Sequence, residues 1–92
     1  MTPVPYKSTP VFDEVSLPQA LRNAHNTKAG VWALIQVLNG AVRYHVEDGS
    51  APPAVLVPGR PGLIRPRQLH HVEPLGPMRM RVDFYTEEPA IG

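Results

Sequence analysis

Proline and glycine recur so often in this sequence that they limit the length of every secondary structure element. Twelve prolines and seven glycines are spread over 92 residues, and the segment 58–62 alone holds two of each. Proline breaks helices and is excluded from central strands, so the chain is divided into short apolar runs. Many short strands separated by such turns are typical of a sandwich or barrel. We therefore predict one all-β domain over residues 1–92, with loose termini at residues 1–5 and 87–92.

Three segments give the clearest strand signals. Residues 31–38 form a nearly continuous apolar run that is rich in β-branched and aromatic side chains and is followed by Asn39-Gly40. Asn-Gly suits a type I′ turn, which predicts a hairpin that pairs this run with residues 41–47. Residues 78–86 alternate between apolar and polar side chains, as does the run 41–47, and this period of two indicates half-buried strands. Ser16 begins a short capped helical turn.

Charge and composition narrow the classes of function. Nine basic and eight acidic residues leave a net charge of +1, which does not favour nucleic acid or an anionic membrane as a partner. No apolar run approaches the ~20 residues of a membrane-spanning helix, so we expect a cytoplasmic protein. The sequence has no cysteine, and a metal site would therefore need histidine or carboxylate ligands.

Five segments carry a resemblance to a known family. They are residues 7–12, 25–32, 37–44, 66–77 and 82–85, which together extend over most of the chain. In this order they resemble the small tellurite-resistance (TehB/YeaR-like) cupin family. The resemblance implies a cupin-type double-stranded β-helix, or jelly roll. Members occur alone or joined to a methyltransferase domain, for which we expect no room in this chain.

The resemblance implies a site in the barrel mouth. His25 and His70 lie near two ligand positions of the cupin pattern, and imidazole is a good ligand for Zn, Ni or Fe. Glu73 is the predicted third ligand and Asp83 is the alternative. Strand alternation places His70 and Glu73 on opposite faces, so Glu73 would need a bend before Pro74 to join the site.

Further residues are candidates for binding a ligand or supporting the site. They are Asp83, Arg43, Tyr44, Trp32 and Lys28, although Trp32 also suits a core position and Lys28 a solvated one. The expected function is binding of a divalent metal, a small anionic ligand, or both, in oxyanion or oxidative stress response. The alternative is a non-catalytic stress-response or interaction module with no metal. Whether the protein is an enzyme stays open. We also expect a homodimer, with residues 6–12 as the candidate edge strand, and a small-molecule or oxyanion partner.

Overall fold

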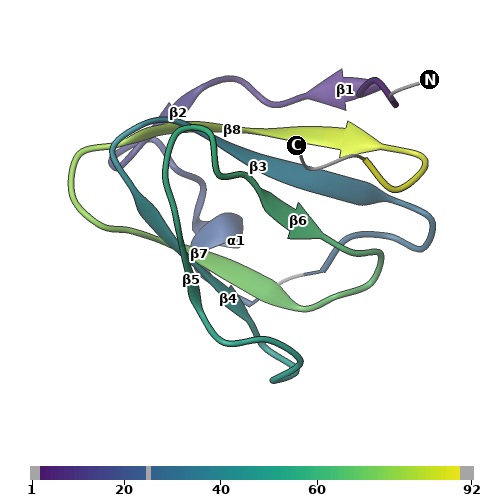
Figure 1. Cartoon of the computed structure of the whole chain (residues 1–92). Helices are drawn as coiled ribbons and strands as arrows, with labels where there is room; N and C mark the ends of the chain where they lie inside the picture. The colour runs from purple at the N-terminus through teal and green to yellow at the C-terminus, as the bar shows by residue number, and fades with distance from the viewer. Residues whose placement is uncertain (1–2, 25, 90–92) are drawn as a thin grey trace.

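The chain forms two antiparallel sheets that pack face to face. The computed structural model describes residues 3–24 and 26–89. The five-stranded sheet has the order β1-β8-β3-β6, with β2 also paired to β8 (Figure 1). Its strands are β1 (Lys7–Ser8), β2 (Phe12–Asp13), β3 (Trp32–Asn39), β6 (Gly62–Ile64) and β8 (Arg79–Tyr85). The three-stranded sheet has the order β5-β4-β7, from β4 (Val42–Val46), β5 (Ala54–Leu56) and β7 (His70–Pro74).

The core lies between the two sheets and follows the alternation of the strands. On β8, Met80 and Val82 are buried in the core, while Arg79 on the opposite face is exposed. On β4, Val42 and Tyr44 point inward in the same way. The predicted alternation of both segments is confirmed. We call the face of each sheet that points to this core its inner face.

The predicted hairpin at Asn39-Gly40 is wrong. β3 pairs with β8 and β6, whereas β4 pairs with β5 and β7, so this turn carries the chain from one sheet to the other. The apolar faces of β3 and β4 thereby face each other across the core, which two adjacent strands of one sheet cannot do. Gly40 still adopts the positive φ that the sequence predicts, at 74°.

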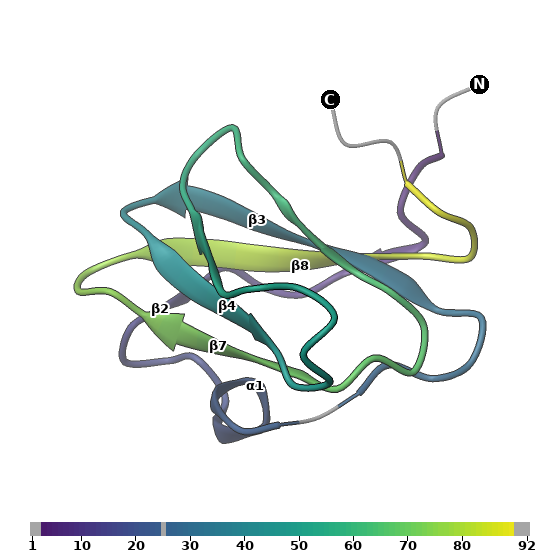
Figure 2. The ribbon, with the colours of Figure 1, turned by 60° about the horizontal axis from the view of Figure 1, so that its bottom comes forward.

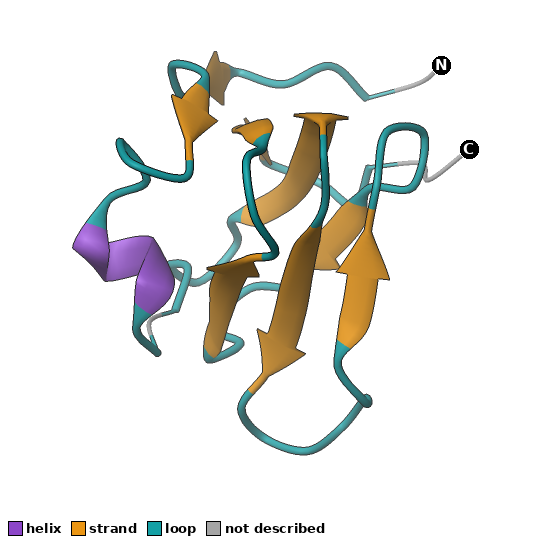
Figure 3. Ribbon diagram, turned by 90° about the vertical axis from the view of Figure 1, so that its left-hand side faces the viewer, coloured by secondary structure: helices purple, strands orange, loops and turns teal. Residues whose placement is uncertain are grey.

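Helix α1 (Gln19–Arg22) lies beside β7, at the margin of the two-layer structure (Figures 2 and 3). The turn before it is closed by side chains, because the Asp13 carboxylate accepts hydrogen bonds from the backbone N–H groups of Val15 and Ser16 at 2.9 and 2.7 Å. Ser16 is not the helix cap, since its hydroxyl accepts from the Asp13 N–H instead.

The all-β prediction is confirmed, since α1 is the only helix in the described part of the chain and has four residues. The two sheets do not close into a barrel. Within residues 3–24 and 26–89, no helix has the length and apolarity that crossing a membrane requires. Of the predicted loose termini, residues 1–2 and 90–92 lie outside the described residues.

Candidate ligand pocket

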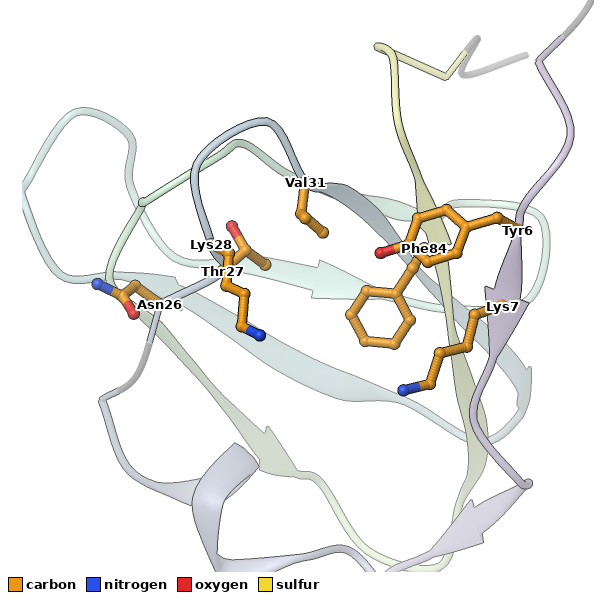
Figure 4. A pocket seen from close by; sticks show the side chains of 7 residues that line it. All are labelled: Tyr6, Lys7, Asn26, Thr27, Lys28, Val31 and Phe84. Carbon is orange, nitrogen blue, oxygen red and sulfur yellow. The ribbon is translucent and has the colours of Figure 1, made fainter.

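A pocket of about 300 Å³ opens at one end of the inner face of the five-stranded sheet. The loop of residues 26–31, which leads into β3, forms one side of it, and β1 with the end of β8 forms the other (Figure 4). Its lining combines two lysines with apolar and uncharged polar side chains: Tyr6, Lys7, Asn26, Thr27, Lys28, Val31 and Phe84. We call this site the Lys7–Lys28 pocket.

Backbone pairing between β1 and β8 places Lys7 beside Phe84. Lys7 stands directly opposite Phe84 in the antiparallel register, so both side chains are on the same face of the sheet. The Tyr6 N–H donates to the Phe84 carbonyl at 2.9 Å and extends this pairing by one residue. The Lys7 Nζ lies 5.9 Å from the centre of the Phe84 ring, within the range of a cation–π contact.

The loop on the other side is anchored by Thr27, which is 8% exposed. Its hydroxyl donates to the Arg65 carbonyl at 2.9 Å and accepts from the Arg67 N–H at 3.1 Å. Residues 28–31 then form a turn closed by the Val31 N–H, which donates to the Lys28 carbonyl at 3.1 Å. Gly30, with φ of 78°, occupies the position of a type II turn that needs a positive φ. These hydrogen bonds hold the backbone on both sides of Lys28 in place.

Of the two predicted histidine ligands, His25 lies outside the described residues. His70 is fully buried on the inner face of the three-stranded sheet. Its Nδ1–H donates to the Gln68 carbonyl at 2.8 Å, and its ring makes an edge contact with Tyr44, with ring centres 6.0 Å apart. His70 thus packs in the core and is not among the residues that line the Lys7–Lys28 pocket.

Glu73 and Arg43 lie together on the outer face of the three-stranded sheet, away from His70. Glu73 is exposed, and its Oε1 is 3.2 Å from His45 Nε2 and 3.5 Å from an Arg43 guanidinium nitrogen. The hydrogen bond from His45, followed by the charge of Arg43, lowers the pKa of Glu73. No bend before Pro74 turns this carboxylate inward, because β7 keeps its alternation through Glu73.

The neighbouring histidines form a stacked pair on the same outer face. His45 and His71 are directly opposite in the register of β4 and β7, and their rings stack with centres 4.2 Å apart and planes 8° apart. Glu47 also contacts His71 through a hydrogen bond to Nδ1. In the described part of the chain, no group of three or more histidine, cysteine or acidic side chains has the geometry to hold a metal ion.

Asp83 and Trp32 lie on the outer face of the five-stranded sheet, on the far side from the Lys7–Lys28 pocket. Asp83 is buried and accepts hydrogen bonds from the Ser8 hydroxyl at 2.7 Å and from Arg81 Nε at 3.0 Å. Trp32 is partly buried and lies 6.0 Å beneath the Arg65 guanidinium. Both residues therefore make contacts within the outer face.

Tyr44 connects the two sheets. Its hydroxyl, on β4, donates to the Leu63 carbonyl on β6 at 3.0 Å. Burial of the phenol raises its pKa to about 12, and the nearby Asp48 charge adds to the shift. Tyr44 is thus a neutral donor inside the protein.

Of the predicted candidates within residues 3–24 and 26–89, Lys28 alone lines the pocket. Sequence reasoning missed Lys7, Tyr6 and Phe84 as its partners. The alternation of residues 78–86 did place Phe84 on the inner face, but no local signal pairs it with Lys7, which is 77 positions away in the sequence.

These observations define a small two-sheet, all-β domain with an open, lysine-flanked pocket at one end. A family described as the TehB-like domain matches residues 7–82. The chain belongs to this family, and the predicted resemblance to the tellurite-resistance family is confirmed.

The sequence is similar to a protein from Haemophilus influenzae named probable S-adenosyl-L-methionine-dependent methyltransferase TehB. In strain 10810 and in strain KW20 / Rd the identity is 29% over 92 residues, covering 90% of this chain. The chain spans only 31% of the length of these curated relatives.

Solved structures are also similar to this one, and two of them illustrate the likeness. The crystal structure of TehB from Haemophilus influenzae superposes with a TM-score of 0.80 at 29% identity, covering 91% of this chain and 31% of that one. A protein from E. coli strain K12 superposes with a TM-score of 0.81 at 20% identity, covering 97% of this chain and 94% of that one. The second likeness concerns the fold alone.

The comparisons correct the predicted function. Both relatives are named probable S-adenosyl-L-methionine-dependent methyltransferases, which contradicts the predicted cupin metal-binding function and the alternative of a stress-response module without a methyltransferase. The prediction of a divalent metal cofactor, Zn, Ni or Fe, is wrong. Its physical weakness was the third ligand, because alternation along β7 puts Glu73 on the opposite face from His70.

Proposed function

We propose that this chain is a domain that works with an S-adenosylmethionine-dependent methyltransferase unit and takes part in handling its small-molecule substrate. One observation carries the proposal: 90% of the chain matches a part of TehB that makes up 31% of that protein. The methyl transfer itself is assigned to the remaining part. In support, the described residues pair only in antiparallel sheets and contain no parallel βαβ unit of the kind that binds nucleotides in doubly wound folds.

A chimera tests this proposal. In one variant of Haemophilus influenzae TehB this chain replaces the matched segment, and in a second variant that segment is deleted. We expect the chimera to retain S-adenosylmethionine-dependent methyl transfer and the deletion to lower it. A chimera with no more activity than the deletion would refute the proposal. The purified 92-residue chain, assayed alone, should transfer no methyl group.

We also propose that the fold is a cupin-type jelly roll. Two packed antiparallel sheets joined by chain crossings, as at Gly40, suit the cupin-type jelly roll in an open form. An experimental structure in which the strand order of either sheet differs from β1-β8-β3-β6 or β5-β4-β7 would contradict it.

Homodimer formation and a cytoplasmic location stay predictions. β1 and β2 do form an outer edge beside β8, but each has two residues and Pro10 lies between them. Such a short, interrupted edge offers few backbone groups to a second copy. Sedimentation at tens of micromolar distinguishes monomer from dimer, and cell fractionation tests the location.

A further inference from the structure

The Lys7–Lys28 pocket carries an unbalanced positive charge. Two of its seven lining residues are lysines and, among the described residues that line it, none is acidic. In the ion pairs within residues 3–24 and 26–89 the cations are Arg43, His45, His71 and Arg81, so neither lysine is neutralised there. Two ammonium groups on one concave surface attract an anion.

The two lysines line the same pocket from different sides. Lys7 extends from β1 and Lys28 from the loop opposite, and in Figure 4 the Lys28 amino group lies to the left of the Phe84 ring and the Lys7 amino group lies below it. Their backbones are held by separate interactions: pairing with β8 for Lys7, and the Thr27 hydrogen bonds beside Lys28. An anion bound between them would therefore meet two lysine side chains whose backbone attachment points are fixed by the fold.

The rest of the lining is suited to an apolar body. Phe84 and Val31 are partly buried and line the pocket together with the ring of Tyr6. A pocket of about 300 Å³ is at the small end of the range for small-molecule sites. An aromatic ring can pack on Phe84 while its charged group lies between the ammonium groups, because offset stacking and charge attraction act at different atoms.

We propose that the Lys7–Lys28 pocket binds a small aromatic anion with a doubly charged head group, of which a phosphate monoester is the simplest kind. Two lysine charges match a dianion, and lysine binds phosphate as a point charge without a fixed fork geometry. This inference goes beyond the methyltransferase proposal, since it rests on the residues of the pocket alone. Failure of either proposal leaves the other standing.

Phenyl phosphate is the probe that tests the site, titrated into the purified chain at about pH 8, where phosphate monoesters are doubly charged. Chemical shifts of backbone amides report both affinity and location. We expect saturable shifts at residues 26–31 and at Lys7. Inorganic phosphate should bind more weakly than phenyl phosphate because it lacks the ring. Benzyl alcohol should also bind more weakly than phenyl phosphate because it lacks the charge. Raising the salt from about 0.02 M to about 0.5 M should also weaken binding.

Three variants give the matched comparison. Lys7→Gln and Lys28→Gln should each weaken phenyl phosphate binding by about two- to fivefold, as expected for loss of one solvent-exposed ion pair. Arg60→Gln removes an exposed cation of the turn at 58–62, outside the pocket lining, and should bind like the unmodified chain. All three changes are on exposed side chains, and a circular dichroism spectrum confirms that each variant folds.

Two outcomes would overturn the proposal. One is the absence of saturable shifts at about 10 mM phenyl phosphate, which corresponds to a binding free energy too small for a formed site. The other is an affinity that falls as much in Arg60→Gln as in the two lysine variants. That result would mean that the probe senses net charge and not this pocket.

Discussion

Gly40 is the position where a single methyl group should do the most damage to the two-layer arrangement. This residue turns the chain from β3 in one sheet to β4 in the other, with φ of 74°. A Cβ added here would lie 2.9 Å from the Met78 Cα and closer still to the Pro77 carbonyl oxygen. Both neighbours are backbone atoms, so the clash cannot be relieved by rotating a side chain.

Gly49 provides a matched control. Its φ of 75° is nearly the same, but a Cβ there would have no heavy atom within 4 Å. In both variants alanine is forced into the left-handed region, which costs about 1–2 kcal/mol. Only Gly40→Ala adds overpacking, which costs about 1–3 kcal/mol more. We therefore expect a loss of about 2–5 kcal/mol for Gly40→Ala and about 1–2 kcal/mol for Gly49→Ala.

Urea unfolding followed by tryptophan fluorescence measures both losses, since the chain has one tryptophan. The quantity of interest is the difference between the two variants, because the change in unfolded-state entropy is shared and cancels. A free energy of unfolding that differs by less than about 0.5 kcal/mol would show that the segment 77–78 moves aside freely, and the steric reasoning would be refuted.

Three further predictions concern single side-chain groups. Tyr44→Phe removes the hydroxyl that donates to the Leu63 carbonyl and should lower the free energy of unfolding by about 0.5–1.5 kcal/mol in urea. Burial raises the pKa of Tyr44 to about 12, so its neutral form stabilises the fold below pH 10, and this stabilisation is lost as pH rises through about 12. The free energy of unfolding of Tyr44→Phe should therefore decline less at alkaline pH than that of the unmodified chain. The pKa of Glu73 is lowered in the fold, so its ionised carboxylate stabilises the folded state above pH 4.5, and this stabilisation is lost as pH falls through the folded-state pKa. The melting temperature of Glu73→Gln should therefore fall less with acid than that of the unmodified chain. Thr27→Val keeps the shape of the side chain but removes two hydrogen bonds at a buried site, and should cost about 1–3 kcal/mol in urea as well as weakening phenyl phosphate binding.

Local patterns predicted the strands but not how they associate. The alternation along residues 41–47 and 78–86 identified the inner faces correctly, because side-chain direction in a strand depends only on its own period of two. The hairpin failed because strand partners are chosen over the whole chain. β3 pairs with β8 on one edge and with β6 on the other, and β4 instead joins the opposite sheet, where its apolar face packs against that of β3.

The predicted metal site shows the same limit for function. His70 and Glu73 were both predicted as ligands of one metal, yet alternation along β7 turns His70 into the core and Glu73 to the outer face. There, Glu73 pairs with Arg43 and His45, a conventional cross-strand cluster. The residue types alone therefore suggested plausible metal ligands, but alternation along the strand places these ligands on opposite faces of the sheet.

Lys7 points toward the pocket only because the register of β1 against β8 is fixed. A slip by one residue would turn Lys7 outward and bring Ser8 to the inner face. On the outer face the Ser8 hydroxyl is bound to the buried Asp83 at 2.7 Å, and the Thr9 hydroxyl accepts the Val82 N–H at 2.9 Å, so a slip would break both contacts. The slip would leave the buried Asp83 carboxylate with the Arg81 hydrogen bond alone, and the loss of the Ser8 donor makes the slipped register costly. Asp83, which does not line the pocket, therefore helps from the opposite face of the sheet to keep Lys7 on the inner face.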